Sequence, residues 1–191
     1  MPSFNVDQLP YVTSSVERFL VNPDGNADGM ILVNGVEVYF APYLSADVLT
    51  AIQAGDRITV YGVLPMAEPM IAAMIIEAAN GMRIEDCGPP TQKLPGTMAN
   101  QRIKARETSR LEVEALVRRT LHGPNGETRG VLLDDGTTVV LPVHRREDLS
   151  ALLSPASWLT VRGAGLVTQM GMAIRADEIG ESAQTLRVLQ H

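Results

Sequence analysis

The sequence predicts an all-β-dominated protein made of two tandem copies of one small five-stranded barrel. The first observation behind this prediction is an internal repeat, in which residues 16–62 align with residues 117–163 without a gap. The residues that are identical between the copies are mostly glycines, a proline and aliphatic residues, which determine turns and fill interiors. The second observation is an alternation of apolar and polar residues within each copy, interrupted by hairpin signals.

The first part of each copy predicts three strands joined by two hairpins. Residues 15–22 are rich in β-branched and aromatic residues and end at Pro23-Asp24-Gly25, where proline presets φ and glycine accepts a positive φ. Residues 29–33 lead into Asn34-Gly35, the dipeptide most typical of a tight hairpin. Residues 36–41 then alternate between apolar and more polar positions, as a half-buried strand does.

A short helix and two further strands complete the first copy. Residues 45–52 begin with serine, carry an acidic residue in the first turn and space their apolar residues on one helical face, and Gly55 ends this segment. Residues 56–62 alternate and predict a fourth strand. Residues 70–78 predict a fifth strand, because their counterpart at 171–178 alternates more clearly.

The second copy repeats this scheme. Its turns are Pro124-Asn125-Gly126 and Asp135-Gly136, which predict the same two hairpins. Residues 146–153 predict the short helix, ended by Pro155, and residues 157–163 predict the fourth strand.

This order of elements resembles the OB-fold, a five-stranded Greek-key barrel. The resemblance covers both repeats and rests on the glycine-rich turns, the two hairpin dipeptides, the short helices and the run from Gly55 to Gly62, which is similar to the fourth strand of many OB domains. The chain is also similar to uncharacterised bacterial proteins that carry OB-like repeats. We therefore expect two tandem five-stranded OB-fold Greek-key barrels, each with a short helix between strands 3 and 4.

Changes in composition along the chain predict the domain boundaries. The stretch between the copies is rich in proline and glycine up to Gly96 and then becomes basic, as expected for a linker without a core of its own. The predicted units are an N-terminal tail at 1–13, a first OB-fold repeat at 14–80, a linker at 81–111, a second repeat at 112–180 and a C-terminal tail at 181–191.

Composition also excludes several kinds of site. No apolar run approaches the roughly 18 residues that span a bilayer, and the start of the chain lacks the features of a secretory signal, so we expect a cytoplasmic protein without a membrane partner. The single Cys87 excludes an internal disulfide, and the three histidines lack the spacing of a zinc site. Because no nucleophile or phosphate-loop motif is present, we expect no catalytic residues, no metal, no cofactor and no enzymatic activity.

Charge is divided unevenly between the copies. Residues 1–92 contain 3 basic and 11 acidic side chains (net −8), whereas residues 93–191 contain 13 basic and 11 acidic side chains (net +2), which together give −6. Nucleic-acid binding depends on neutralising phosphates, so the second copy and the basic linker are the better candidates for it. OB domains that bind single strands usually combine such basic residues with aromatic stacking platforms, and here the tyrosines lie mainly in the acidic copy.

We therefore predict a non-catalytic binding protein that contacts single-stranded DNA or RNA through the second repeat and the basic linker. Strand parity places Tyr39, Tyr61 and Arg162 on the outside of their barrels. The candidate contact residues are Arg118, Arg129, His144, Arg145, Arg146, Arg162, Tyr39 and Tyr61. The other interpretation of these residues is a set of solvated arginines and half-buried tyrosines.

A protein-interaction or assembly module without a nucleic-acid ligand is the alternative function. In this case the acidic first copy docks a protein partner or packs against the second copy. Arg18 and Arg119 occupy equivalent positions and share the parity of neighbouring apolar residues, so we expect them to face inward and to pair with Asp47 and Asp148. The sequence leaves the oligomeric state and the packing of the two barrels open.

Overall fold

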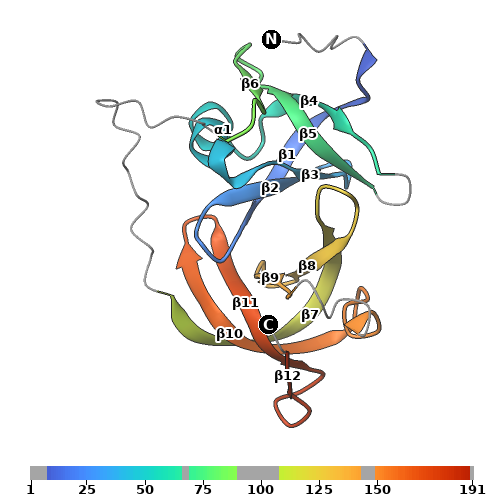
Figure 1. The fold of residues 1–191 in the computed structure, drawn as a ribbon, viewed down its shortest axis with the longest axis vertical. Coiled ribbons are helices and arrows are strands. Elements are labelled where there is room, and N and C mark those ends of the chain that lie inside the picture. Colours follow the sequence, from blue (N-terminus) through green and yellow to red (C-terminus); the bar gives the residue numbers. More distant parts are fainter. Residues whose placement is uncertain (1–7, 66–68, 90–107, 143–148, 190–191) are drawn as a thin grey trace.

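The computed structural model describes residues 8–65, 69–89, 108–142 and 149–189, which form two closed five-stranded barrels (Figure 1). The strands of the first barrel are β1 (Tyr11–Val21), β2 (Ala27–Leu32), β3 (Glu37–Tyr39), β4 (Arg57–Val63) and β5 (Met70–Glu77). They pair in the order β1–β2–β3–β5–β4, and β4 closes the barrel on β1. Only the β3–β5 pair is parallel. This is the strand order of the OB-fold, so the predicted fold is confirmed.

The second barrel repeats this topology. Its strands are β7 (Ser109–His122), β8 (Thr128–Leu133), β9 (Thr138–Val140), β10 (Trp158–Thr168) and β11 (Gly171–Gly180). β9 and β11 form the parallel pair, and β10 pairs with both β7 and β11 to close the barrel. Two short strands, β6 (Arg83–Glu85) and β12 (Arg187–Val188), pair antiparallel with β5 and β11. They lie within the ranges expected to be linker and tail.

A short helix follows the third strand in the first barrel only, as far as the structure describes the chain. A 3₁₀ turn, η2 (Pro42–Leu44), leads into α1 (Ser45–Ala51), and the Ser45 hydroxyl accepts a hydrogen bond from the Ala27 N–H instead of capping the helix. In the second copy, residues 150–153 are turns, and residues 143–148 lie outside the described residues. Of the predicted second helix, the described residues form one turn, in which the Leu153 N–H donates to the Leu149 carbonyl, and Pro155 follows this turn.

Two repeated glycines mark where strands approach too closely for a side chain. A Cβ at Gly62 would lie 1.9 Å from the Ala72 carbonyl oxygen, and a Cβ at Gly163 would lie 1.9 Å from that of Arg175. Both glycines sit beside a register shift between the fourth and fifth strands of their barrel. The repeat conserves them between the two copies because the barrel geometry leaves no room for a larger residue.

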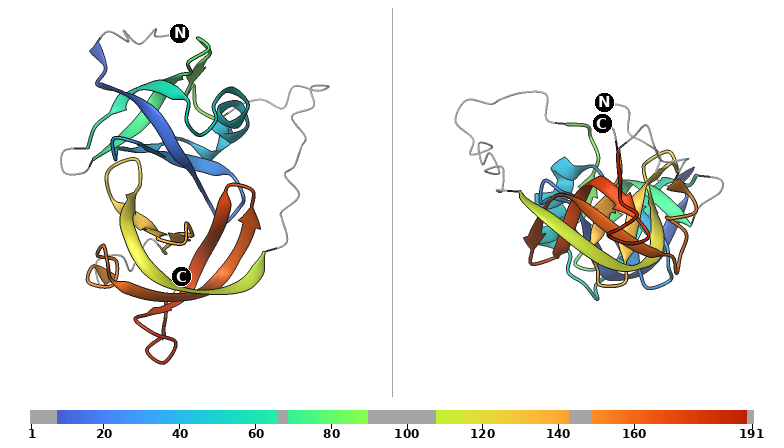
Figure 2. Two further views of the ribbon diagram at one scale, coloured as in Figure 1. Left: turned by 180° about the vertical axis from the view of Figure 1, so that it is seen from behind. Right: turned by 90° about the horizontal axis from the view of Figure 1, so that it is seen from below.

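The two barrels are stacked on each other along the long axis of the molecule (Figure 2). Besides the core of each barrel, a third apolar cluster consists of Leu20, Ile31, Leu121 and Leu132, two residues from each barrel. These residues lie on the outer faces of β1 and β2 and of β7 and β8. We call this contact the junction.

No helix in the described residues is long and apolar enough to cross a membrane.

A bulge in the first strand of each barrel directs residues toward the junction. The pairing register of β1 shifts between Val16 and Arg18, and that of β7 shifts between Val117 and Arg119. An extra residue reverses the alternation of faces beyond it, so Val16 enters the barrel core whereas Leu20 enters the junction.

The predicted inward orientation of Arg18 and Arg119 is therefore wrong. Arg18 donates a hydrogen bond to the Gly136 carbonyl and Arg119 donates one to the Gly35 carbonyl, each across the junction and each 2.9 Å long. Asp47 is not their partner, and Asp148 lies outside the described residues.

Candidate nucleic-acid interface

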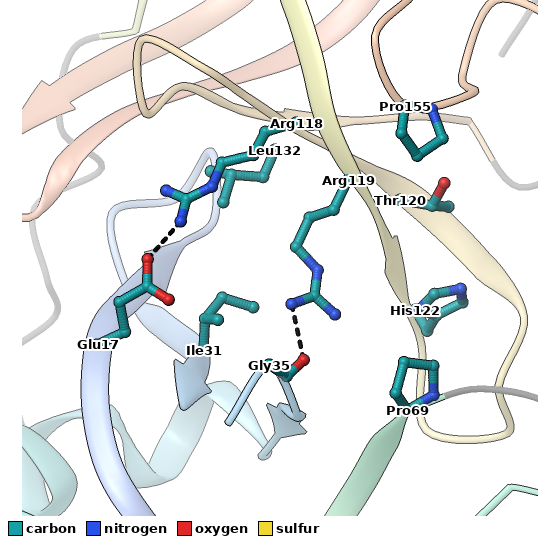
Figure 3. A pocket seen from close by; sticks show the side chains of 10 residues that line it. All are labelled: Glu17, Ile31, Gly35, Pro69, Arg118, Arg119, Thr120, His122, Leu132 and Pro155. Carbon is teal, nitrogen blue, oxygen red and sulfur yellow. Dashed lines mark hydrogen bonds and ion pairs between the residues drawn. The ribbon is translucent and has the colours of Figure 1, made fainter. Parts of the chain in front are cut away.

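A hollow of about 390 Å³ opens where the two barrels meet (Figure 3). We call it the junction groove. Its wall combines apolar side chains from both barrels with basic and polar side chains from β7. The lining residues are Glu17, Ile31, Gly35, Pro69, Arg118, Arg119, Thr120, His122, Leu132 and Pro155.

Two consecutive arginines of β7 extend toward the first barrel in this groove (Figure 3). The bulge places Arg118 at an irregular position of the strand, where its side chain remains 45% exposed and forms an ion pair with Glu17. Arg119 uses Nη1 to donate to the Gly35 carbonyl, and its buried Nε has no hydrogen-bond partner among the described residues. A ligand in the groove can therefore reach the exposed guanidinium of Arg118, which has more N–H donors than its contact with Glu17 uses, whereas the buried Arg119 Nε is not accessible to it.

A third guanidinium, that of Arg18, adds positive charge close to the groove. Burial lowers the pKa of Arg18, and the charge of the nearby Arg118 lowers it further, against the opposing effects of Glu17 and Asp135. The positive charge of Arg118 that lowers the pKa of Arg18 also favours the binding of an anion at this position.

Arg129 lies in the junction and not on an open surface. Its side chain is 9% exposed, its Nη1 lies 2.6 Å from Asp28 Oδ2, and its guanidinium lies 5.5 Å from the centre of the Tyr39 ring. Burial raises the pKa of Asp28 even though Arg129 acts to lower it. Burial likewise raises the pKa of the half-buried Tyr39. Two predicted nucleic-acid contacts thus meet each other and a carboxylate at the junction.

His122 and Glu37 form a second buried polar contact across the junction. The Glu37 carboxylate accepts the His122 backbone N–H at 3.0 and 3.2 Å and lies 3.0 Å from His122 Nδ1. The Glu37 side chain is fully buried. This carboxylate therefore links the last residue of β7 to the first residue of β3.

Arg162 and Tyr61 occupy equivalent positions on the two barrels, away from the junction groove. Tyr61 packs against Tyr11 on the neighbouring strand, with ring centres 5.7 Å apart, and its hydroxyl lies 3.3 Å from a Glu77 oxygen. Arg162 instead pairs with Glu112 on the neighbouring strand, at 2.8 Å. This hydrogen bond raises the pKa of Arg162. The first barrel thus has an aromatic pair where the second has an ion pair.

The remaining predicted contacts lie outside the described residues. These are His144, Arg145 and Arg146, together with Arg102, Lys104 and Arg106 of the basic linker. Arg110, also assigned to the linker, lies on β7 and forms an ion pair with Glu178 at 2.6 Å. The groove instead adds residues that the sequence analysis did not select, namely Arg119, Thr120 and His122. Strand parity predicts that Arg119 faces inward, whereas the bulge before it directs its side chain into the junction.

Tyr43 donates a hydrogen bond to Asp86, and the effect of this contact on the titration of Tyr43 can be tested directly. Burial first, and then its hydrogen bond to Asp86, raise the pKa of Tyr43 to about 12. We expect Asp86→Asn to return this pKa toward the ordinary value of about 10. The contact stabilises the fold below pH about 10 and loses that effect as the pH rises to about 12, because the folded state holds the proton longer.

An ultraviolet titration of the four tyrosines measures this effect. In the unsubstituted chain one tyrosine should ionise later than it does in Asp86→Asn. Identical titration curves for the two proteins would contradict the assignment.

Comparison with known proteins identifies no family. No family model and no curated protein matches the chain. Among solved structures, the chain is similar to the wild-type single-stranded DNA binding protein from Thermus aquaticus, with 12% identity and a TM-score of 0.27 over 95% of this chain and 92% of that one. A deletion mutant of the same protein gives the same identity and TM-score over 95% and 93% of the two chains. At these values the similarity carries no functional argument, and the fold rests on the strand order described above.

Proposed function

We propose that the protein binds single-stranded nucleic acid, without catalysing a reaction, along the junction groove, with β7 of the second barrel as the main contact strand. The observation that carries this proposal is the pair of adjacent guanidinium groups, Arg118 and Arg119, in an open groove with apolar walls. Phosphates need such donors, and sugars and bases can pack on the exposed rings of Pro69 and Pro155, which line the same groove.

The experiment is a fluorescence anisotropy titration of labelled mixed-sequence single-stranded DNA and RNA with increasing salt. We expect binding at about 50 mM salt that weakens steeply as salt screens the phosphate contacts. Absence of binding at this low salt would contradict the proposal.

Removal of one guanidinium should reduce both the affinity and its salt dependence. We expect Arg118→Gln to reduce the magnitude of the logarithmic salt slope by about 0.7, the value for one phosphate contact on a single strand. The matched control is Arg83→Gln, because Arg83 is similarly exposed, at 37%, and also forms an ion pair, with Glu85 at 2.7 Å, but it lies on β6. Equal losses in both variants would contradict a specific contact in the groove.

A protein-interaction or assembly module is the second candidate, and the junction favours it. The outer faces of β2 and β3, with which OB domains commonly bind oligonucleotides, contribute Asp28, Ile31 and Glu37 to the contact with the other barrel. If this contact is the main role of the two surfaces, the anisotropy titration gives no binding. If the protein also assembles between chains, light scattering then gives a mass that rises with protein concentration.

A further inference from the structure

Residues that meet at the junction are often equivalent positions of the internal repeat. Glu17 pairs with Arg118 and Asp28 pairs with Arg129, and in both cases the partners are 101 positions apart, which is the shift that superimposes the two copies. Arg18 and Arg119 make reciprocal contacts with Gly136 and Gly35, which are again equivalent residues. The barrels thus meet as the two subunits of a symmetric dimer do, with equivalent residues facing each other near a pseudo-twofold axis.

Part of this surface is the same on both barrels. The apolar cluster takes one leucine from β1 and one from β7, together with Ile31 and its counterpart Leu132. The two arginine-to-carbonyl hydrogen bonds are also identical in kind. These contacts would form equally well between two first barrels or between two second barrels, so they cannot select a partner.

The charged part of the surface differs between the barrels. In the arginine–carboxylate ion pairs that cross the junction in the described residues, the acid comes from the first barrel and the arginine from the second, with separations of 2.6 Å for Asp28–Arg129 and 3.5 Å for Asp24–Arg175. Glu37 of the first barrel likewise contacts His122 of the second, at 3.0 Å. Two first barrels meeting by this surface would bring Asp28 against Asp28 and Glu17 against Glu17. Two second barrels would bring arginine against arginine. Like charges in such positions oppose pairing strongly, and most strongly when they are buried.

We propose that the junction is a charge-coded docking surface that accepts only a barrel of the opposite repeat, and that a second copy of this chain can supply that barrel. In one chain, the segment between Glu85 and Ser109 connects the barrels and keeps them at a high effective concentration, so each barrel pairs with its own neighbour. When the pairing within the chain is made unfavourable and a complementary copy is present, two chains exchange barrels reciprocally. This inference does not depend on nucleic-acid binding.

The test uses two full-length variants with opposite changes of charge. One carries Glu17→Arg and Asp28→Arg, and the other carries Arg118→Glu and Arg129→Asp. Alone, each variant has like charges at the junction, both within the chain and between copies, so we expect a lowered thermal midpoint and a monomeric mass. After mixing, both junctions of an exchanged dimer are complementary, so we expect a twofold increase in mass by light scattering.

Two controls keep the outcome decisive. A single chain that carries all four substitutions should remain monomeric. Its thermal midpoint should recover more than half of the decrease seen in the variants with two substitutions. Glu85→Arg mixed with Arg83→Glu changes an ion pair within the first barrel and should give no dimer.

If the variants with two substitutions do not fold, the partly exposed pair Glu17→Arg and Arg118→Glu replaces them. A mixture that stays monomeric, or single variants that dimerise as well as the mixture, would overturn the proposal.

Discussion

Arg129→Leu is expected to lower the free energy of unfolding by about 3–5 kcal/mol, because it removes one partner of a buried ion pair. The side chains of Asp28 and Arg129 are 8% and 9% exposed, and their closest atoms are 2.6 Å apart. Without the guanidinium, the Asp28 carboxylate would remain charged inside the junction with no cation beside it. Urea denaturation of the full chain at neutral pH measures the loss.

The pH dependence of this loss identifies its cause. Burial already raises the pKa of Asp28 against the effect of Arg129, and removing Arg129 raises it further. A raised pKa means that the folded state holds the proton, so the deficit of Arg129→Leu should be smallest at low pH and should grow as the pH rises through the pKa of Asp28. A deficit that does not change with pH would contradict this explanation.

The double variant Asp28→Leu with Arg129→Leu is the matched comparison. In the described residues, Asp28 Oδ1 and Arg129 Nε and Nη2 are buried without a hydrogen-bond partner, so the ion pair is incompletely satisfied. Replacing such a pair by two apolar side chains is often neutral or stabilising. We therefore expect the double variant to be more stable than Arg129→Leu. If it is equally unstable, the effect comes from packing and not from the lone charge.

The barrels could be predicted from the sequence because their determinants are local. Asn34-Gly35 and Asp135-Gly136 specify hairpins within a few residues, and the alternation of strands such as 56–62 reports the side of the barrel that each residue faces. Duplication made each of these signals visible twice. The fifth strand is predictable only from the repeat, because residues 70–78 alone have a composition that also suits a helix.

The junction could not be predicted because it depends on a bulge and on a contact between distant parts of the chain. One extra residue in β1 reverses the faces of Arg18 and Leu20, and strand parity alone assigns both to the wrong side. The uneven charge of the two copies is visible in the sequence, and it fits both nucleic-acid binding by the basic copy and packing of the acidic copy on the basic one. Arg129 illustrates the ambiguity, because its sequence context is the same whether it faces a phosphate or Asp28.

Leu121→Ala is expected to lower the free energy of unfolding by about 2–5 kcal/mol, through lost burial and the cavity that remains. Leu121 is fully buried in the cluster that joins the barrels, and its neighbours come from both of them. The control is Leu64→Ala, because Leu64 is 49% exposed and the same substitution there should change stability by less than about 0.5 kcal/mol. Similar losses in the two variants would mean that the cluster does not contribute to stability as its burial suggests.

Nucleic-acid binding by Leu121→Ala then distinguishes where the bound nucleic acid lies. A nucleic acid in the junction groove needs Arg118 and Arg119 held against the first barrel, so loosening the contact between the barrels should weaken binding. A nucleic acid on the outer faces of β2 and β3 would instead gain access as the barrels separate, and its binding should strengthen. Because Leu121 offers no charge to a phosphate, either change in affinity reports the arrangement of the barrels and not the loss of a direct contact. We expect weaker binding, and stronger binding would move the proposed site from the groove to the faces that the junction covers.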